Sequence, residues 1–404
     1  MHIAALRALE FDRIVDAVRA FALTPMGDKR LAGLEPSTDP AQVAALLAST
    51  TEATRYIARY GGFPLRAHDD LPAILGALAV EGRALEGLRL LVLATFLGSV
   101  DDTRTAIRRV AATFPLVDKA GANAASFTGE IAKTRATVDA SGDVVDDASP
   151  QLRSLRDRLR RQKTRLRGTL ESYLRGKDTS KYLQDQVVTE RNGRYVLVVK
   201  AELRSGIPGI VHGASASGAS LYLEPLSTVE INNDIVALEE QEAEEVRRIL
   251  LELTEAFRGR PIDIARTVEA AVELDVLQAR ARYSESIDGI EPRLSTDGAF
   301  ELQAARHPLL KAPVPVTIKI IPPATEHGRQ DRGVKDGGAA RPDGAVRPSH
   351  SSGGRVPASS VPIGLRGHRR RAVDRSEPQH LLGAHHQHCV DGPAAVRPRP
   401  CAAG

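Results

Sequence analysis

Four cationic side chains occupy a short stretch in which the residue pattern changes from helical to extended. Arg191, Arg194, Lys200 and Arg204 lie within 14 residues, and cations at that density can neutralise nucleic-acid phosphates. The alternative is charge that protects an edge strand from aggregation. The pattern favours neither interpretation, and these four residues form the candidate nucleic-acid-binding site.

The same stretch is expected to form two β-hairpins. Two β-branched runs, 186–189 and 195–199, flank Asn192-Gly193, a dipeptide that suits a turn with two positive φ angles. A second pair of runs, 209–212 and 220–223, is joined by a Gly/Ser-rich loop. That loop lacks the Gly-x4-Gly-Lys-Ser/Thr order of a phosphate-binding loop, so a flexible turn is expected there.

Two long amphipathic segments flank the hairpins and must position them. The first has leucines at spacings of three, four and seven: Leu152, Leu155, Leu159, Leu166, Leu170 and Leu174. Its flanks are rich in arginine, whereas the second segment, from Ile231 to Phe257, has a comparable apolar seam with glutamate-rich flanks. Matching seams of opposite charge predict an antiparallel coiled coil. Arms of about 25 residues would reach on the order of 35 Å.

The Asp-rich run from Gly142 to Pro150 is the first potential metal site. It lacks the Asx-x-Asx-x-Asx-Gly order of a calcium loop, so a turn followed by a Ser-Pro helix start is expected instead. Thr24-Pro25 and Asp39-Pro40 predict two earlier helix starts.

Composition limits the class of protein. A chain of 404 residues with 4 % aromatic residues and no Trp suits two or three domains with helical, Leu/Ala/Val-filled packing. No run of about 18 apolar residues and no signal peptide are found, which predicts a cytoplasmic protein. The net charge of +4 divides into −2 for residues 1–323 and +6 for the rest, and both cysteines lie in that basic tail. No disulfide framework or zinc pattern is supported.

Six motifs follow one another along residues 1–323: Leu9-Glu10-Phe11 with Gly27, then 142–150, 181–185, 191–195, 206–212 and Ala305-Arg306-His307-Pro308-Leu309-Leu310. In this order they resemble the MutS superfamily. More closely, they resemble the second bacterial MutS paralogue, whose members end in an Smr endonuclease domain.

The resemblance implies a mainly α fold with a small β module. It implies a helical core (1–148), coiled-coil lever helices (149–258) with a β clamp at about 183–226, a return to the helical core (259–297), and the start of an incomplete ATPase domain (298–323). Full-length members are described as homodimeric ATPases that use Mg. They bind branched or mismatched DNA, suppress homologous recombination, and bind rRNA when they split collided ribosomes.

Residues 324–404 depart from the family. They contain no aromatic residue and no P-loop, and their composition predicts a disordered tail. Thr325–Arg332 can be encoded ACC GAA CAC GGG CGG CAA GAC CGN, which one base later reads Pro-Asn-Thr-Gly-Gly-Lys-Thr and resembles the family's P-loop. When residues 369–387 are read in the same shifted frame, they can give a string that resembles a later segment of the family. We therefore hypothesise a frameshift near Pro323.

The frameshift hypothesis makes the spacing of His385, His386, His388 and Cys389 accidental, so no metal, cofactor or catalytic residue is expected in this chain. The predicted function is salt-sensitive binding to DNA or ribosomes without ATPase or nuclease activity. One alternative is a coiled-coil scaffold whose tip grips another protein. Another is a non-functional product that is degraded because its truncated domain exposes apolar surface. The sequence does not indicate whether DNA or the ribosome is the main ligand, or whether the chain forms dimers.

Overall fold

The computed structural model describes the backbone of residues 3–296, 299–321 and 365–366. Helices dominate these residues, and their strands form small antiparallel sheets, so the predicted fold class is confirmed at that level. The predicted disordered tail (324–404), with its shifted-frame strings and the cluster from His385 to Cys389, lies outside the described residues except for Leu365–Arg366. Within the described ranges, no helix has both the length and the apolar composition that crossing a membrane requires.

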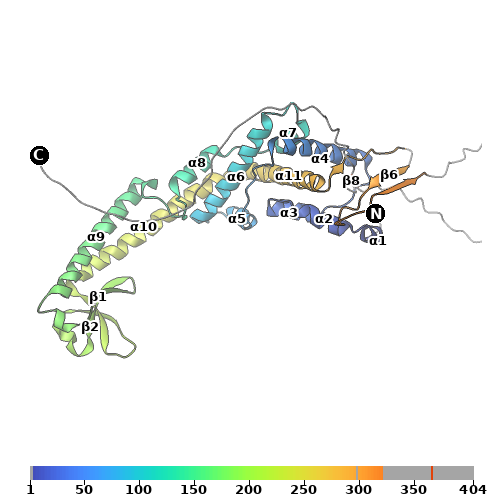
Figure 1. The fold of residues 1–404 in the computed structure, drawn as a ribbon. Coiled ribbons are helices and arrows are strands. Elements are labelled where there is room, and N and C mark those ends of the chain that lie inside the picture. The colour runs from blue at the N-terminus through green and yellow to red at the C-terminus, as the bar shows by residue number, and fades with distance from the viewer. Residues whose placement is uncertain (1–2, 297–298, 322–364, 367–404) are drawn as a thin grey trace, which may run out of the picture. The chain divides into compact units, whose positions relative to one another are not determined.

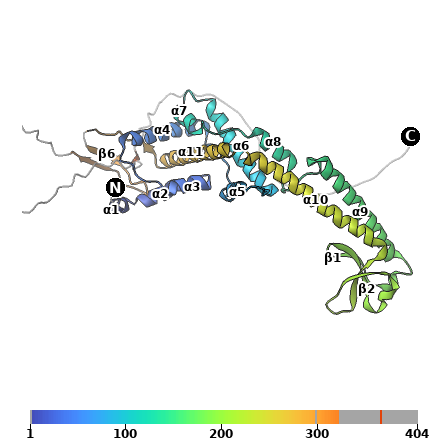
Figure 2. The ribbon, with the colours of Figure 1, turned by 180° about the vertical axis from the view of Figure 1, so that it is seen from behind.

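Apart from two long amphipathic helices, the described chain forms nine α-helices (Figures 1 and 2). They are α1 (Ile3–Ala8), α2 (Phe11–Arg19), α3 (Pro25–Ala32), α4 (Pro40–Tyr60), α5 (Leu71–Leu78), α6 (Gly87–Arg108), α7 (Pro115–Gly121), α8 (Thr128–Thr137) and α11 (Pro261–Ser286). Two starts confirm the predicted caps. The Thr24 hydroxyl accepts a hydrogen bond from Gly27 N at 2.9 Å, and Asp39 accepts one from Ala41 N at 2.9 Å.

One apolar cluster joins helices that lie far apart in the sequence. It buries Leu93 and Phe96 of α6, Leu274 of α11, and Phe257 near the end of α10 (Leu226–Arg258). Burial of each such side chain stabilises the fold by about 1.5–3 kcal/mol. The segments before and after the long helix pair therefore share one core, and α10 is anchored in it.

A buried carboxylate adds a polar tie between α11 and the start of α3. Asp275 accepts hydrogen bonds from Leu23 N and Thr24 N, both at 2.8 Å, and from the Thr24 hydroxyl at 2.7 Å. Burial raises the pKa of Asp275. Gly27 is required beside it, because a Cβ there would lie 2.1 Å from Asp275 Oδ2.

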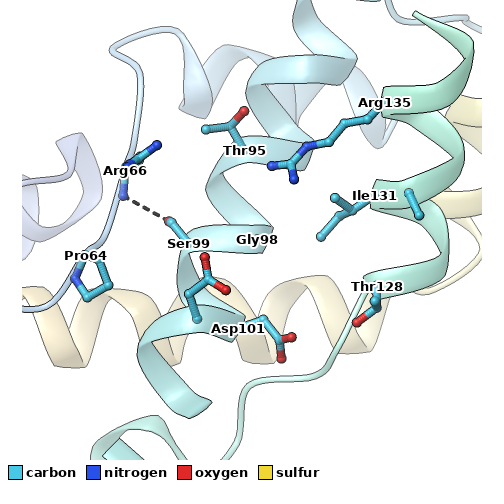
Figure 3. Close-up of a pocket in the computed structure, with 11 residues that line it drawn as sticks. Pro64, Arg66, Thr95, Gly98, Ser99, Asp101, Thr128, Ile131 and Arg135 are labelled. Atoms are coloured by element: carbon cyan, nitrogen blue, oxygen red, sulfur yellow. Dashed lines mark hydrogen bonds between the residues drawn. The ribbon is translucent and has the colours of Figure 1, made fainter. Parts of the chain in front are cut away.

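A cavity of about 420 Å³ lies between α6, α8 and the loop before α5 (Figure 3). Arg66 and Arg135 line it together with Asp101 and Asp102. The backbone N of Arg66 donates a hydrogen bond to the Ser99 hydroxyl at 2.9 Å (Figure 3). Because cations and carboxylates line the cavity in equal number, it offers no preference for an anionic or a cationic ligand.

The two long helices pack side by side in opposite directions (Figures 1 and 2). α9 (Pro150–Arg175) and α10 are joined by ion pairs from Arg156 to Glu242 at 2.6 Å and from Lys163 to Glu239 at 2.7 Å. The apolar seams are buried as predicted: Leu155, Leu159, Leu166 and Leu170 against Ile231, Ile235 and Leu238. Whether the seams interlock as a coiled coil stays a prediction.

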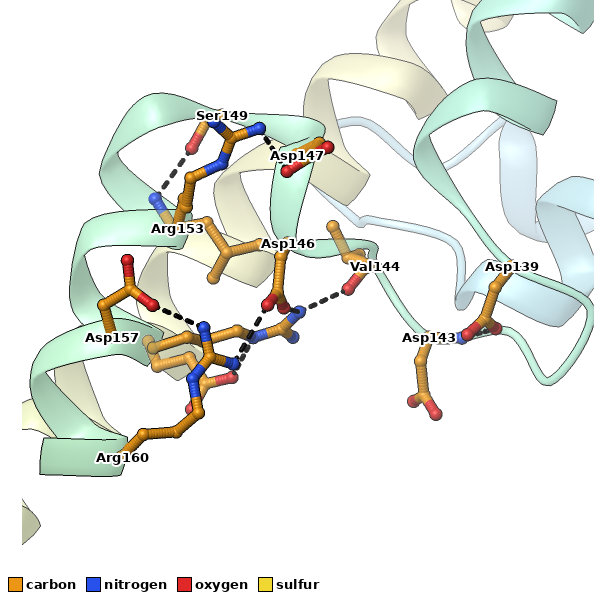
Figure 4. A network of polar contacts seen from close by, with 12 residues as sticks. Asp139, Asp143, Val144, Asp146, Asp147, Ser149, Arg153, Asp157 and Arg160 are labelled. Carbon is orange, nitrogen blue, oxygen red and sulfur yellow. Dashed lines mark hydrogen bonds and ion pairs between the residues drawn. The ribbon is translucent and has the colours of Figure 1, made fainter. Parts of the chain in front are cut away.

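Arginines of α9 hold the Asp-rich loop that precedes it (Figure 4). Asp146, which opens the short 3-10 turn η1 (Asp146–Ala148), accepts from Arg156 at 2.7 Å and from Arg160 at 3.0 Å. Ser149 then caps α9 by accepting a hydrogen bond from Leu152 N at 3.0 Å. The predicted Ser-Pro helix start is confirmed, and the carboxylate of Asp146 orients that start by pairing with arginines.

Glu245 links α10 to this helix start. Its replacement is expected to change the free energy of unfolding by an amount that depends on pH. The buried Glu245 accepts hydrogen bonds from Arg248 at 2.8 Å and from the Ser149 hydroxyl at 2.7 Å, which hold its pKa at about 2 against an ordinary 4.5. Replacing Glu245 by Gln is expected to lower the free energy of unfolding by about 1.5–3 kcal/mol at pH 7.

The sign of this effect sets the pH test. A lowered carboxylate pKa stabilises the fold above the unfolded pKa, and that stabilisation disappears as pH falls towards the folded pKa. The difference between wild type and Glu245→Gln should therefore shrink as pH is lowered from 4.5 towards 2. Urea denaturation over a pH series measures it. A constant difference across that range would contradict the assignment.

A four-stranded antiparallel sheet lies between α9 and α10 in the chain. Its strands are β1 (Leu183–Arg191), β2 (Arg194–Lys200), β3 (Gly209–Ala214) and β4 (Ser220–Pro225), in the order β1-β2-β4-β3. Two 3-10 turns flank them, η2 (Ser180–Tyr182) and η3 (Ala201–Gly206). We call residues 180–225 the β module. Both hairpins are formed where the sequence predicts them.

Four short strands are described after α11. β5 (Gly289–Ile290) pairs with β8 (Leu365–Arg366), and β6 (Phe300–Ala305) pairs antiparallel with β7 (Val316–Ile320). The division of the chain into domains stays a prediction.

Candidate nucleic-acid interface

The tip of the first hairpin carries two of the four candidate residues. Asn192 and Gly193 have φ angles of 54° and 72°, as the Asn-Gly turn requires. This turn places Arg191 directly opposite Arg194 across the two strands. The side chains nevertheless have different surroundings.

Arg191 is an exposed cation that is supported by an aromatic ring. Its guanidinium carbon lies 4.3 Å from the centre of the Tyr222 ring, and its Nη2 donates to the Tyr222 hydroxyl at 3.0 Å. Stacking of this kind fixes the guanidinium plane while leaving its charge available. Arg191 can therefore present its charge to a phosphate.

Arg194, by contrast, belongs to a buried polar network. Its Nη1 donates to Glu224 Oε1 at 2.9 Å and its Nη2 to Asn233 Oδ1 at 2.5 Å. The Glu224 side chain is 0 % exposed and also contacts His212 Nε2 at 2.6 Å and Asn232 Nδ2 at 2.8 Å. The network ties β2, β3 and β4 to α10. Arg194 therefore positions the module, and its role as a phosphate contact stays a prediction.

Lys200 and Arg204 lie at the end of β2 and in the adjoining turn η3. Lys200 is half-buried opposite Ser220, and Arg204 is exposed. The side chain of neither residue forms a hydrogen bond or an ion pair with any residue that the structure describes. Like Arg191, which contacts only the neutral Tyr222, these two side chains carry charge that no described anion compensates.

Three arginines on the outer face of α9 are further candidates. Arg158, Arg161 and Arg165 are exposed, and no described residue pairs with them. Spacings of three and four place them on one face of the helix, whereas Arg156 and Lys163 on another face pair with α10. The sequence shows these spacings, but not which arginines the partner helix neutralises.

Potential metal-ligating side chains are scattered over the described part of the chain. Among the residues that the structure describes, no group of three or more His, Cys, Asp or Glu side chains is placed to hold a metal ion. The β module itself presents charged and hydrogen-bonding side chains, among them Arg191 and Arg204.

Sequence comparison finds close relatives although no family model matches the chain. A protein named Endonuclease MutS2 from Symbiobacterium thermophilum is 36 % identical over 322 residues, which cover 78 % of this chain and 40 % of the relative. Proteins of the same name from Geobacillus thermodenitrificans and Bacillus velezensis are 36 % and 34 % identical, over 76 % of this chain and 39 % of each relative. The chain spans about two fifths of the length of these relatives.

Proposed function

Because this chain belongs to the MutS2 paralogue group of the MutS superfamily, we propose that it binds nucleic acid through its β module. The ligand in this proposal is branched or mismatched DNA, or the rRNA of a ribosome. The contacts are phosphate contacts made by Arg191, Lys200 and Arg204.

The observation that carries the proposal is the unequal compensation of charge. Arg156 and Lys163 are paired with glutamates of α10, and Arg194 is paired with Glu224. Lys200 and Arg204 lie on the same module without an anionic partner among the described residues. A cation that has no anionic partner in the fold does not stabilise the fold by pairing. It is therefore better placed to bind a phosphate.

In this proposal α9 and α10 act as a lever and the β module as a clamp. The 33-residue α10 is about 50 Å long. Its first part packs on the sheet through Ile231, and its last part enters the helical core through Phe257. A single continuous helix therefore connects nucleic-acid contacts to the core mechanically.

The β6–β7 hairpin is proposed as the first part of an ATPase domain. Val316, Ile318 and Ile320 of β7 are 49 %, 41 % and 57 % exposed, which is unusual for a strand of a finished sheet. The 404-residue sequence contains no P-loop, so binding by this chain should not depend on ATP. Homodimer formation is not required for the proposal.

A salt series on two ligands tests the function. The full chain is titrated with four-way DNA junctions and with ribosomes, without ATP, from 50 to 200 mM salt, where phosphate binding by about three contacts predicts a slope of log K against log salt near −2.7. Absence of binding to both ligands at the lowest salt, or binding that ignores salt, would favour the protein-interaction scaffold instead.

A further inference from the structure

A second cavity, remote from the β module in sequence, is lined by α2, α4 and the end of α11. Its volume is about 180 Å³. Most of its lining is apolar and includes Ile14, Val18, Leu46 and Ile287. A cavity of about 150 Å³ can hold one benzene ring, so this one has room for a ring-sized apolar body and a small head group.

Arg280 places a positive charge in this apolar lining. Its Nη2 donates to Leu46 O and to the Thr50 hydroxyl, both at 2.6 Å. Because a guanidinium has five N–H groups, three remain without a partner among the described residues. Burial lowers the pKa of Arg280 to about 10, which keeps it charged at neutral pH.

No carboxylate compensates that charge in the described part of the chain. Glu35 and Glu291 also line the cavity, but both are exposed and neither forms an ion pair with Arg280. Desolvating a cation without an anionic partner is costly. The guanidinium of Arg280 therefore keeps N–H donors and a positive charge that an anion bound beside it could use.

Tyr283, one turn along α11, adds a second unused donor. Its hydroxyl is buried and has no hydrogen-bond partner among the described residues, and burial raises its pKa. Buried hydroxyls are nearly always hydrogen-bonded, so such an atom indicates a missing water, ion or ligand. Tyr283 and Arg280 line the same cavity.

We propose that this cavity binds a small carboxylate with a compact apolar body, whose carboxylate accepts hydrogen bonds from Arg280 and the Tyr283 hydroxyl. The apolar body occupies the space between α2 and α4. A planar carboxylate matches the fork of donors that a guanidinium offers. This site is independent of the proposed nucleic-acid interface, because no residue is shared.

Benzoate is the probe, and neutral benzamide is its matched control. Isothermal calorimetry on the full chain is expected to show saturable binding of benzoate and at least about tenfold weaker binding of benzamide. Arg280→Gln should weaken benzoate binding by about tenfold or more. Tyr283→Phe, which removes one hydroxyl, should weaken it by about two- to tenfold.

Thermal melting of each variant verifies that it is folded, and Tyr283→Phe decides the question if Arg280→Gln unfolds. Equal binding of benzamide and benzoate would show a cavity without anion preference and overturn the proposal. Unchanged benzoate binding in Tyr283→Phe, or no binding by about 10 mM, would overturn it as well.

Discussion

Replacing Glu224 by alanine is expected to lower the free energy of unfolding of the β module by about 3–5 kcal/mol. The Glu224 carboxylate is fully buried and accepts from Arg194 and Asn232 while contacting His212. Its removal leaves a cation and two polar groups without their partner in a desolvated site. Native-state hydrogen exchange at the buried Leu197 and Leu223 amides measures the loss locally.

The matched control for this variant is Glu224→Gln. Glutamine keeps the shape of the side chain and one carbonyl oxygen, so it should retain the bond from Asn232. It loses the charge interaction with Arg194 and replaces the oxygen that faces His212 Nε2 by an NH₂ group. We expect it to destabilise the module less than alanine does. A loss below about 1 kcal/mol for Glu224→Ala would show that the network does not hold the sheet to α10.

Neutralising Lys200 and Arg204 together should weaken DNA-junction binding by about 60-fold at 0.1 M salt. Each phosphate contact contributes about 0.9 to the slope of log K against log salt, which is about eightfold in affinity at that concentration. The double variant Lys200→Gln/Arg204→Gln should therefore reduce the slope by about 1.8. Fluorescence anisotropy over a salt series measures both quantities, and the protein's melting temperature should not change.

Arg247→Gln is the control for loss of charge alone. Arg247 is an exposed residue of α10 that pairs with Glu244 at 2.7 Å, so its removal should alter neither the affinity nor the salt slope. If it weakens binding as much as the change at Lys200 and Arg204, the interaction depends on overall charge. The β module would then have no special role.

A substitution at Arg194 distinguishes a positioning role for this residue from a direct phosphate contact. If Arg194 acts through Glu224, Arg194→Gln should weaken binding in proportion to the stability it removes from the module and leave the salt slope unchanged. A fall of the slope by about 0.9 would instead identify Arg194 as a direct phosphate contact. The two roles thus differ in a quantity that one titration provides.

Local rules predicted much of the fold. The Asn192-Gly193 turn follows from its φ requirements, the start of α9 from the Ser149 cap, and the seam of α9 from leucine spacing. In each case the deciding interaction joins residues that are near in sequence or repeat along one helix. The chain segments between these elements were not needed to recognise them.

The site could be predicted only in part, because charge compensation depends on distant partners. Arg194 meets Glu224 and Asn233, which are 30 and 39 residues away, so its hydrogen bonds are invisible in a local pattern. The cavity around Arg280 is even harder to predict from the sequence, since Arg280 contacts Leu46, which is 234 residues away. The sequence indicates the cationic stretch. The structure adds that Arg194 is paired with an anion, whereas the side chains of Lys200 and Arg204 have no described anionic partner.

Hydrogen–deuterium exchange of the full chain with and without a four-way DNA junction tests the central claim most directly. Binding through the β module predicts slower exchange from Arg191 to Gly206, which includes the hairpin tip and η3, and unchanged exchange in α4 and α6. Protection confined to the helical part, with no change between Arg191 and Gly206, would contradict it.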